Sequence, residues 1–223
     1  MGIENTNAEK VWEGTNTSTD ISQFIQGKQE LTQNQKYIWY VFVKDAIDSA
    51  KSDEFGFTTI DCRPLVYNST TYKTVIIGNQ CWTAKNLNEP EGGSKCYDNN
   101  QANCDMFGRL YNWDEANSIA NKIDGWSFPS KDDWAELVST LGGEAVAGDK
   151  MKEGGSSGFD ALYGGIDFGG SQQINEVTRF WTSTPYDTPS NSWSIGIYIN
   201  NTNSNFSGSS SDLLKASLRL LKD

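Results

Sequence analysis

The hydrophobic pattern of the chain changes character partway along it. Residues 36–44 form an aromatic and β-branched run of strand type, and residues 54–59 form a second, shorter run of the same kind. A polar, turn-like segment over residues 45–53 separates the two runs. From this pattern we predict a small all-β module over residues 1–60 and a second domain over residues 61–223.

The second domain opens with another strand pattern. The sequence from Tyr72 to Trp82 predicts a strand, a turn at Gly78–Asn79 and a second strand. Beyond Gly154 the chain again consists of short strand-type runs and loops.

Two helices are predicted between these strand regions. Residues 112–121 place their apolar side chains along one stripe. The clearer helix begins after Ser130, a good N-cap residue with Asp133 three positions later, and Gly142 ends it. Two helices combined with short antiparallel strands and many loops predict an α+β fold.

Near the C-terminus, residues 192–200 alternate strictly between apolar and polar positions. Such alternation predicts a half-buried strand. We expect its buried face to carry Trp193, Ile195, Ile197 and Ile199, and its exposed face to carry Ser192, Ser194, Gly196, Tyr198 and Asn200. A low-complexity polar loop over residues 201–211 and a strand-like run over residues 215–223 follow.

Composition and charge narrow the classes of function. The chain has 223 residues, with 18 basic against 29 acidic residues, a formal charge of −11 and no histidine. Because nucleic-acid binding depends on clustered Lys and Arg, this charge argues against a nucleic-acid partner. The lack of histidine excludes Ser-His-Asp and Cys-His catalysis and removes the commonest zinc ligand, so we predict no catalytic residues and no metal site for catalysis.

Membrane and export segments are also not expected from the sequence. No apolar run approaches the roughly 18–20 residues that cross a bilayer, so we predict no membrane span. Residues 1–4 show neither the basic nor the apolar stretch of a secretory signal peptide.

The four cysteines contain no Cys-x-x-Cys pair, so a four-thiolate zinc site is a poor match. An even number of cysteines in a chain rich in Ser, Thr and Asn favours disulfides and an oxidising compartment. Three connectivities exist, of which we predict Cys62–Cys81 together with Cys96–Cys104. The alternative is four unpaired thiols in a cytosolic protein.

Acidic residues suggest a carboxylate pair for glycoside hydrolysis. However, Asp132, Asp133 and Glu136 lie in the first turns of one predicted helix, and Asp114 and Glu115 have the same place in the other. Acidic side chains there complement the helix dipole, so we interpret these five as structural.

A structural calcium ion is the one cofactor that the sequence leaves open. Oxygen-bearing side chains gather beside two of the cysteines, at Asp98, Asn99, Asn100 and Asp105. The alternative is a plain polar loop closed by a disulfide. A melting temperature that does not move in a calcium titration would exclude the ion.

Several motifs of the second domain occur together, and in this order, in one protein family. They are YKTVIIGNQCWTAKNL over residues 72–87, FGRLYNW over 107–113, GWSFPS over 125–130, SGFDAL over 157–162, FWTST over 180–184 and SLRLLKD over 217–223. The chain resembles the Fibrobacter succinogenes major paralogous domain, and the resemblance covers residues 61–223.

Two family cysteines are replaced in this chain. Lys122 stands where the family has the cysteine of C-P-x-G-W, and Leu220 stands where it has the cysteine of S-V-R-C. Their joint loss implies that these cysteines bond each other in other members. A missing disulfide costs about 2–4 kcal/mol, so we expect the aromatic core to compensate here.

The first module resembles the last strands of a fibronectin type III or related immunoglobulin-like module. The resemblance rests on the Tyr-x-Trp-x-Val strand from Tyr37, the polar segment that follows it, and the Phe-Thr-Thr ending at Thr59. Such sandwiches need roughly 100 residues. Either the chain starts inside the module or the module is a reduced one.

The family resemblance implies a C-type lectin-like fold, close to its formylglycine-generating-enzyme branch. Proteins with this fold include the variable proteins of diversity-generating retroelements, in which mutagenesis enriches Asn, Ser, Thr, Tyr, Asp and Gly at exposed positions. The resemblance therefore implies a non-enzymatic ligand-binding protein in which residues 182–211 form a variable surface. We expect ligand contacts at Tyr186, Asp187, Asn191, Ser194, Tyr198, Asn200, Asn203 and Phe206.

Other functions compete with ligand display. One is a structural or adhesion module without hypervariation. Another is a formylglycine-generating-type enzyme, but that chemistry needs a late pair of reactive cysteines and no cysteine follows Cys104. A further alternative is calcium-dependent sugar binding, but the chain lacks the Glu-Pro-Asn and Trp-Asn-Asp motifs of proteins that bind sugars in this way. The resemblance implies an extracellular protein of a bacterial cell surface or a phage virion, with a protein or glycan ligand on a cell surface as its partner.

Overall fold

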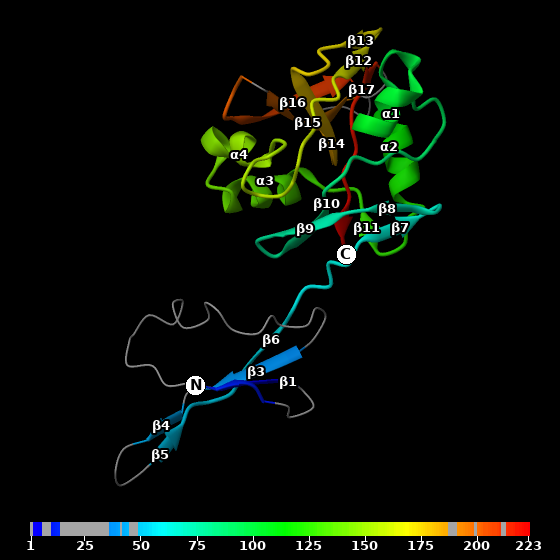
Figure 1. Ribbon diagram of the computed structural model, residues 1–223. Helices are drawn as coiled ribbons and strands as arrows, with labels where there is room; N and C mark the ends of the chain where they lie inside the picture. Colours follow the sequence, from blue (N-terminus) through cyan, green and yellow to red (C-terminus); the bar gives the residue numbers. More distant parts are fainter. Residues whose placement is uncertain are drawn as a thin grey trace. The chain divides into compact units, whose positions relative to one another are not determined.

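The computed structural model describes residues 2–5, 10–13, 36–40, 42–44, 49–186, 191–198, 200–210 and 213–223. The chain divides into two compact units, Met1–Asp61 and Cys62–Asp223, one residue beyond the boundary predicted from the sequence (Figure 1).

The first unit consists of β-strands in its described parts. These are β1 (Gly2–Asn5), β2 (Lys10–Glu13), β3 (Lys36–Tyr40), β4 (Phe42–Lys44), β5 (Ser49–Lys51) and β6 (Phe55–Thr58). Strands β2, β1, β3 and β6 form an antiparallel sheet in that order, and β4 pairs with β5 in a separate hairpin. The segment predicted as a turn over residues 45–53 therefore contains a strand, because β5 continues the pairing of β4.

The second unit contains four α-helices in its described residues, which makes it α+β. A short 3₁₀ helix, η2 (Tyr97–Asn99), precedes them, and they are α1 (Gln101–Phe107), α2 (Trp113–Ala120), α3 (Lys131–Thr140) and α4 (Glu144–Met151).

The two predicted helices, α2 and α3, are confirmed, whereas α1 and α4 were not predicted. The N-cap of α2 is Asn112 and that of α3 is Ser130, and both helices have a capping box. Helix α4 follows Gly143 without a side-chain cap. It is also short and rich in small residues, which leaves little periodic pattern in the sequence.

The strands of the second unit are short and form small, mainly antiparallel sheets. They are β7 (Leu65–Tyr67), β8 (Thr70–Tyr72), β9 (Thr74–Ile77), β10 (Gln80–Thr83), β11 (Trp126–Ser127), β12 (Ile166–Phe168), β13 (Ser171–Gln172), β14 (Val177–Pro185), β15 (Asn191–Tyr198), β16 (Ser204–Ser210), β17 (Leu214–Lys215) and β18 (Leu221–Lys222). The predicted hairpin around Gly78–Asn79 is confirmed as β9 and β10. The sheets run in the orders β11-β18-β10-β9, β13-β12-β17 and β14-β15-β16, with β7 and β8 as a separate hairpin.

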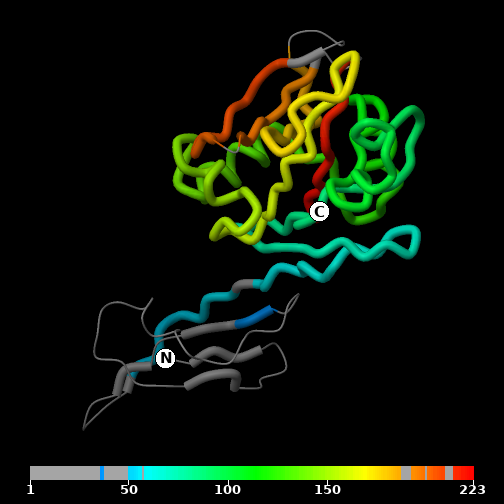
Figure 2. The backbone as a smooth tube through the Cα atoms, turned by 45° about the horizontal axis from the view of Figure 1, so that its top comes forward, coloured from blue at the N-terminus to red at the C-terminus, as the bar shows by residue number. Residues whose placement is uncertain are grey.

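The C-terminal segment organises the second unit. In Figure 2 it runs, in red, between the α1–α2 region and the sheet β14–β16. Both disulfides lie in this unit, and the predicted pairing of Cys62 with Cys81 and of Cys96 with Cys104 is confirmed.

The core of the second unit is built from aromatic rings. Trp134 lies 4.6 Å from Trp82 and 5.3 Å from Phe180 between ring centroids, and Phe159 meets Phe180 edge-to-face. These four side chains are completely buried. Aromatic pairs of this kind add about 0.5–1.5 kcal/mol each beyond the burial of their area.

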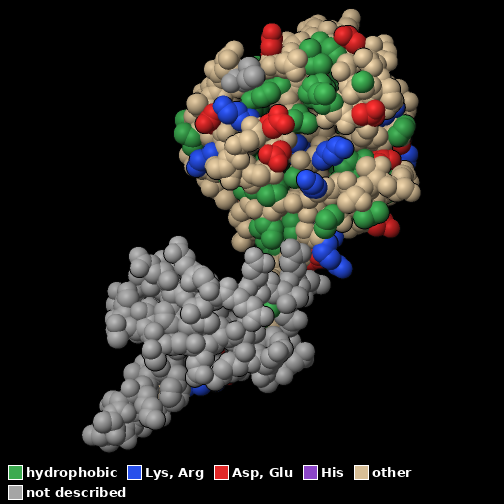
Figure 3. Space-filling model, viewed as in Figure 1, with side chains coloured by type: hydrophobic (Ala, Val, Ile, Leu, Met, Phe, Trp, Pro, Cys, Tyr) green, Lys and Arg blue, Asp and Glu red, His purple; other side chains and the backbone are tan. Residues whose placement is uncertain are grey.

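The two positions that lack the family cysteines differ in environment. Leu220 is completely buried, whereas Lys122 lies on the surface and forms an ion pair with Glu91 at 2.6 Å. The hydrogen bonds from Lys122 and Ser118 hold the pKa of Glu91 below its usual range. Elsewhere on the visible face of the second unit, basic and acidic side chains are interspersed (Figure 3).

Candidate ligand-binding site

The sheet β14–β16 carries the residues that were expected to bind a ligand. Strand β15 lies in its middle and pairs antiparallel with β14 and with β16. The face that turns to the core carries Phe180 and Ile195, and the opposite face carries Trp181 and Ser194 side by side. All four side chains are completely buried. Both faces of the sheet are therefore buried at its centre, and the solvent-exposed side chains lie at its margin.

The predicted exposed face of β15 is buried at its centre. Ser192 is 2% exposed and Ser194 is 0% exposed, and Gly196 is also buried. The hydroxyl of Ser194 lies 3.3 Å from the carbonyl oxygen of Ser207. The prediction of Ser194 as a ligand contact is therefore wrong. Alternation with a period of two indicates a strand with one buried and one solvent-exposed face. Here the second face is buried as well, because Trp181 of β14 lies on it beside Ser194.

The predicted buried face of β15 is confirmed at Ile195 and Ile197, which are both 0% exposed. Trp193 is half-buried, so its assignment to the core is wrong. Ile199 lies outside the described residues.

The other predicted contact residues lie along the margin of the sheet. Tyr186 is 46% exposed and Asn200 is also exposed, whereas Tyr198, Asn203 and Phe206 are half-buried. Asp187 and the side chain of Asn191 lie outside the described part of the chain.

Three aromatic side chains gather around a lysine at the start of α3. We call Lys131, Tyr186, Trp193 and Phe206 the aromatic patch. The rings of Tyr186 and Trp193 meet edge-to-face with centroids 4.6 Å apart. The Nζ of Lys131 lies 3.5 Å from the ring centroid of Trp193 and 5.6 Å from that of Phe206. The patch thus offers aromatic surface and a cation in one place.

Helix α3 positions the lysine of this patch. Ser130 caps the helix, which makes Lys131 its first residue, and the backbone N–H of Lys131 donates to Oγ1 of Thr184 in β14 at 3.0 Å. Tyr186 lies over Gly208, where an added Cβ would come within 2.6 Å of its ring. Lys131 could not be predicted from the sequence, because no local spacing connects a helix N-terminus with aromatic residues that follow 55 to 75 positions later.

Tyr198 is held in place by an arginine that the sequence analysis also missed. The guanidinium of Arg179 donates from Nη2 to the hydroxyl of Tyr198 at 3.2 Å and from Nη1 to Oγ of Ser207 at 2.9 Å. The ring of Tyr198 lies back over Gly196, within 3.2 Å of where a Cβ would be. Tyr198 therefore covers the sheet and exposes only part of its ring.

The polar loop before β16 is anchored to α4. The hydroxyl of Thr202 donates to the carbonyl oxygen of Ala145 at 2.8 Å, and its own carbonyl oxygen accepts from the N–H of Asp149 at 3.0 Å. Asn201 accepts from the N–H of Asn203 at 3.0 Å. These contacts fix the loop backbone while the side chain of Asn200 stays exposed.

A comparison with protein families identifies the second unit. The model of the Fibrobacter succinogenes major domain matches residues 75–222, which include the whole sheet β14–β16 and the aromatic patch. The chain belongs to this family. No curated protein and no solved structure matches the chain.

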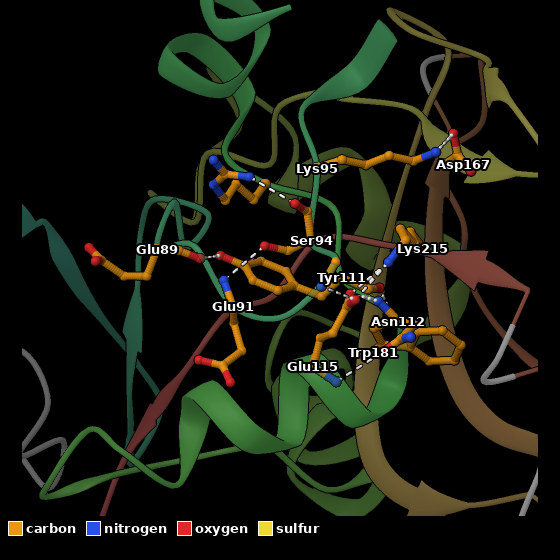
Figure 4. Close-up of polar contacts among 12 residues, drawn as sticks. Glu89, Glu91, Ser94, Lys95, Tyr111, Asn112, Glu115, Asp167, Trp181 and Lys215 are labelled. Carbon is orange, nitrogen blue, oxygen red and sulfur yellow. Dashed lines mark hydrogen bonds and ion pairs between the residues drawn. The ribbon is translucent and has the colours of Figure 1, made fainter. Parts of the chain in front are cut away.

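Several carboxylates of the Fibrobacter succinogenes major domain form ion pairs and hydrogen bonds within the domain (Figure 4). Glu115 accepts from the N–H of Asn112 at 2.8 Å and from Nζ of Lys215 at 2.7 Å. Asp167 is buried and forms an ion pair with Lys95 at 2.7 Å. The structural interpretation of Glu115 is confirmed, as is that of Asp133, which accepts from the backbone N–H of Ser130 at 2.7 Å.

Two of the four predicted calcium ligands, Asn100 and Asp105, use their side chains in hydrogen bonds within the domain. Asn100 caps α1 by accepting from the N–H of Ala102, and Asp105 accepts from Gln101 at 2.9 Å. The backbone N–H of Asp98 donates to Oγ of Ser171 at 2.8 Å. In the described parts of the chain, no group of three or more Cys, Asp or Glu side chains is arranged to hold a metal ion.

A cavity of about 370 Å³ lies elsewhere in the domain. The cavity is lined by both apolar and polar side chains, which are those of Phe107, Lys152, Glu153, Leu162, Tyr163 and Asn175. Burial raises the pKa of Tyr163. The predicted contact residues do not line this cavity.

The helices of the domain are short. The longest, α3, has 10 residues, and no helix in the described ranges is suited to cross a membrane.

Proposed function

We propose that this chain is a non-enzymatic ligand-binding protein whose Fibrobacter succinogenes major domain presents its ligand surface at the margin of the sheet β14–β16. The aromatic patch is the observation that carries this proposal. It sets a half-exposed tyrosine and a tryptophan beside a lysine on a sheet that is anchored in the core by Phe180, Ile195 and Ile197. Tyrosine and tryptophan supply contact area at a low cost in conformational entropy.

A role outside catalysis is supported by how the reactive groups are used. All four cysteines are joined in disulfides, and the chain has no histidine. The buried carboxylate of Glu89 accepts hydrogen bonds from Tyr72 and Asn68, that of Asp167 forms an ion pair, and that of Glu115 serves both an ion pair and a helix cap. Formylglycine-generating chemistry would need a free thiol pair late in the domain.

The finer points of the fold and location belong to the same proposal. We take the second unit to be C-type lectin-like, which the mixture of short helices and small sheets supports. The sheet β2-β1-β3-β6 supports an immunoglobulin-like or fibronectin type III-like first unit. Two disulfides favour an extracellular site, on a bacterial cell surface or a phage virion.

We further propose that residues 182–211 are hypervariable through a diversity-generating retroelement. The support is their composition, in which Asn, Ser and Thr dominate residues 200–205. The gene's neighbourhood tests this part. A reverse transcriptase gene and a template repeat are expected there, and their absence would end the proposal of hypervariation while leaving ligand binding untouched.

Binding of the full chain to a glycan array and to a panel of cell-surface proteins tests the ligand surface. We expect Tyr186→Ala to weaken binding of any captured ligand at least about tenfold, as for an aromatic hot spot. Phe168→Ala is the matched control, because Phe168 is 49% exposed against 46% for Tyr186 and lies outside the aromatic patch. Equal binding by both variants would contradict the proposed surface.

A further inference from the structure

Strand β16 is an unusual edge strand. It ends the sheet β14-β15-β16 and has 7 residues, whereas the edge strands of the other two larger sheets in the described second unit, β9, β11, β13 and β17, have 2 to 4. The opposite edge of the same sheet is covered, since β14 makes parallel bridges from Thr178 to Gly165 and from Phe180 to Ser217. The long open edge of this sheet is therefore on the side of β16.

The sequence of β16 lacks the features that usually protect an edge. Residues 204–210 read SNFSGSS, with no charged residue and no proline. Their pairing with β15 is regular over seven residue pairs and contains no bulge. Natural edge strands are normally protected by lysine, proline, bulges or short length, because an open edge is a template for pairing with another strand.

The surroundings of β16 fix one end of it and leave the other part accessible. Helix α4 holds the loop at Thr202, immediately before the strand. Among the described residues, no backbone hydrogen bond joins residues 205–210 to any strand other than β15. Asn205 and Gly208 are exposed, and in Figure 2 the orange segment of β16 follows the outer margin of the unit.

We propose that β16 is the docking edge for an extended peptide segment of a partner protein, which adds a fourth strand to the sheet β14–β16. This inference rests on the proposed function and deepens it, because it names a peptide backbone as the ligand's essential chemistry. Main-chain hydrogen bonds supply affinity in this mode of recognition, and alternate side chains supply specificity.

The two sides of the edge define the segment that fits. On one side, the added strand meets Phe206 and the ring of Tyr186 over Gly208. On the other side it meets Asn205 and Ser207. The fitting segment therefore alternates apolar or aromatic residues with small polar ones. With a formal charge of −11 on the chain, a neutral or basic segment is favoured over an acidic one.

Selection of linear peptides tests the proposal. A phage-displayed library of random 12-residue peptides is selected on the full chain, and each selected peptide is then resynthesised with single N-methyl groups along its backbone. We expect N-methylation to weaken binding at least tenfold at every second residue and little in between, because one edge of an added strand faces β16. Hydrogen exchange is expected to slow at alternate amides of residues 204–210 when the peptide binds.

Two variants with the same change in charge locate the peptide. Asn205→Lys introduces a lysine into the edge strand, and Asn121→Lys introduces one at the exposed C-terminal end of α2, outside the ligand surface. We expect at least tenfold weaker peptide binding for Asn205→Lys and less than a twofold change for Asn121→Lys.

Several results would overturn strand addition. They are a library that yields no binder, a binder without the alternating N-methyl pattern, and a binder that leaves hydrogen exchange in β16 unchanged. Protection of the same amides by self-association, seen as a concentration-dependent dimer in sedimentation, would identify a second copy as the occupant instead. Each leaves the ligand-binding proposal standing if Tyr186→Ala still weakens binding to the array or the protein panel at least about tenfold.

Discussion

Arg219 joins the C-terminal segment to two segments that are distant from it in sequence, residues 83–86 and 159–160. It donates to Oδ1 of Asn86 at 2.6 Å and to the carbonyl oxygens of Thr83, Phe159 and Asp160 at 2.7–3.0 Å. Its guanidinium also lies 4.6 Å from the ring of Phe159. Burial lowers the pKa of Arg219 to about 9, so the group remains charged at neutral pH.

Replacing this arginine tests its structural role. Arg219→Met leaves several buried acceptors without a donor, and each such loss costs about 1–3 kcal/mol. We expect the free energy of unfolding, measured in urea, to fall by at least about 3 kcal/mol. Lys85→Met is the control, because Lys85 is exposed and should change stability little. Equal losses in the two variants would show that Arg219 does not hold these segments together.

The raised pKa of Tyr72 allows a prediction of how the free energy of unfolding changes at alkaline pH. It donates to the buried carboxylate of Glu89 at 2.7 Å, and burial, followed by this hydrogen bond, raises its pKa above the ordinary value of 10. Above pH 10 the unfolded chain therefore releases this proton first, binds fewer protons than the folded chain, and becomes favoured. The contribution is present below pH 10 and is lost as pH rises towards the folded-state pKa.

Comparison with Tyr72→Phe isolates this contribution. The variant cannot release the proton, so its free energy of unfolding should fall less steeply above pH 10, by at most about 1.4 kcal/mol per pH unit. Urea unfolding at several pH values on either side of 10 measures both slopes. Parallel curves for the variant and the natural sequence would mean that Tyr72 does not titrate with unfolding.

At the scale of elements, the capping box of α3 is the clearest local stabiliser. Oγ of Ser130 accepts from the N–H of Asp133 at 3.1 Å. We expect Ser130→Ala to destabilise the protein by about 1 kcal/mol. Ser139→Ala in the same helix is exposed and should be close to neutral. Thermal unfolding of the two variants measures the difference, and a neutral Ser130→Ala would remove the cap from the account.

The elements that the sequence predicts well are those whose cause is local. The caps of α2 and α3 and the hairpin at Gly78–Asn79 depend on residues a few positions apart. Helix α4 lacks such a cap, and the burial of Ser194 depends on Trp181 in another strand. The serine and glycine residues at alternate positions of β15 were interpreted as a solvent-exposed face, whereas small residues equally indicate close packing.

In the candidate site, too, the features with a local cause could be predicted from the sequence and the contacts between distant residues could not. Exposure of Tyr186 and Asn200 followed from their position among polar, loop-forming residues. The contacts of Lys131 with Trp193 and of Arg179 with Tyr198 join elements that are distant in sequence, so no periodicity predicts them.

At the scale of the whole molecule, the second unit combines a closely packed aromatic interior with exposed side chains at the margin of the sheet β14–β16. Trp82, Trp134, Phe159 and Phe180 are packed on one another, and the charged groups described above are engaged in pairs and caps. Close-packed interiors tolerate few substitutions, whereas exposed positions away from special contacts usually change stability by less than about 0.5 kcal/mol.

Randomisation of chosen positions tests this division most directly. In one library of the full chain, three exposed positions are fully randomised: Tyr186, Asn200 and Asn205. In a second library, three buried positions are fully randomised: Trp134, Phe180 and Ile195. The measured quantity is the fraction of displayed clones that survive protease treatment. We expect most clones of the first library and few of the second to survive. Equal survival, or loss of most clones from the first library, would contradict a fixed frame that carries an exchangeable binding surface.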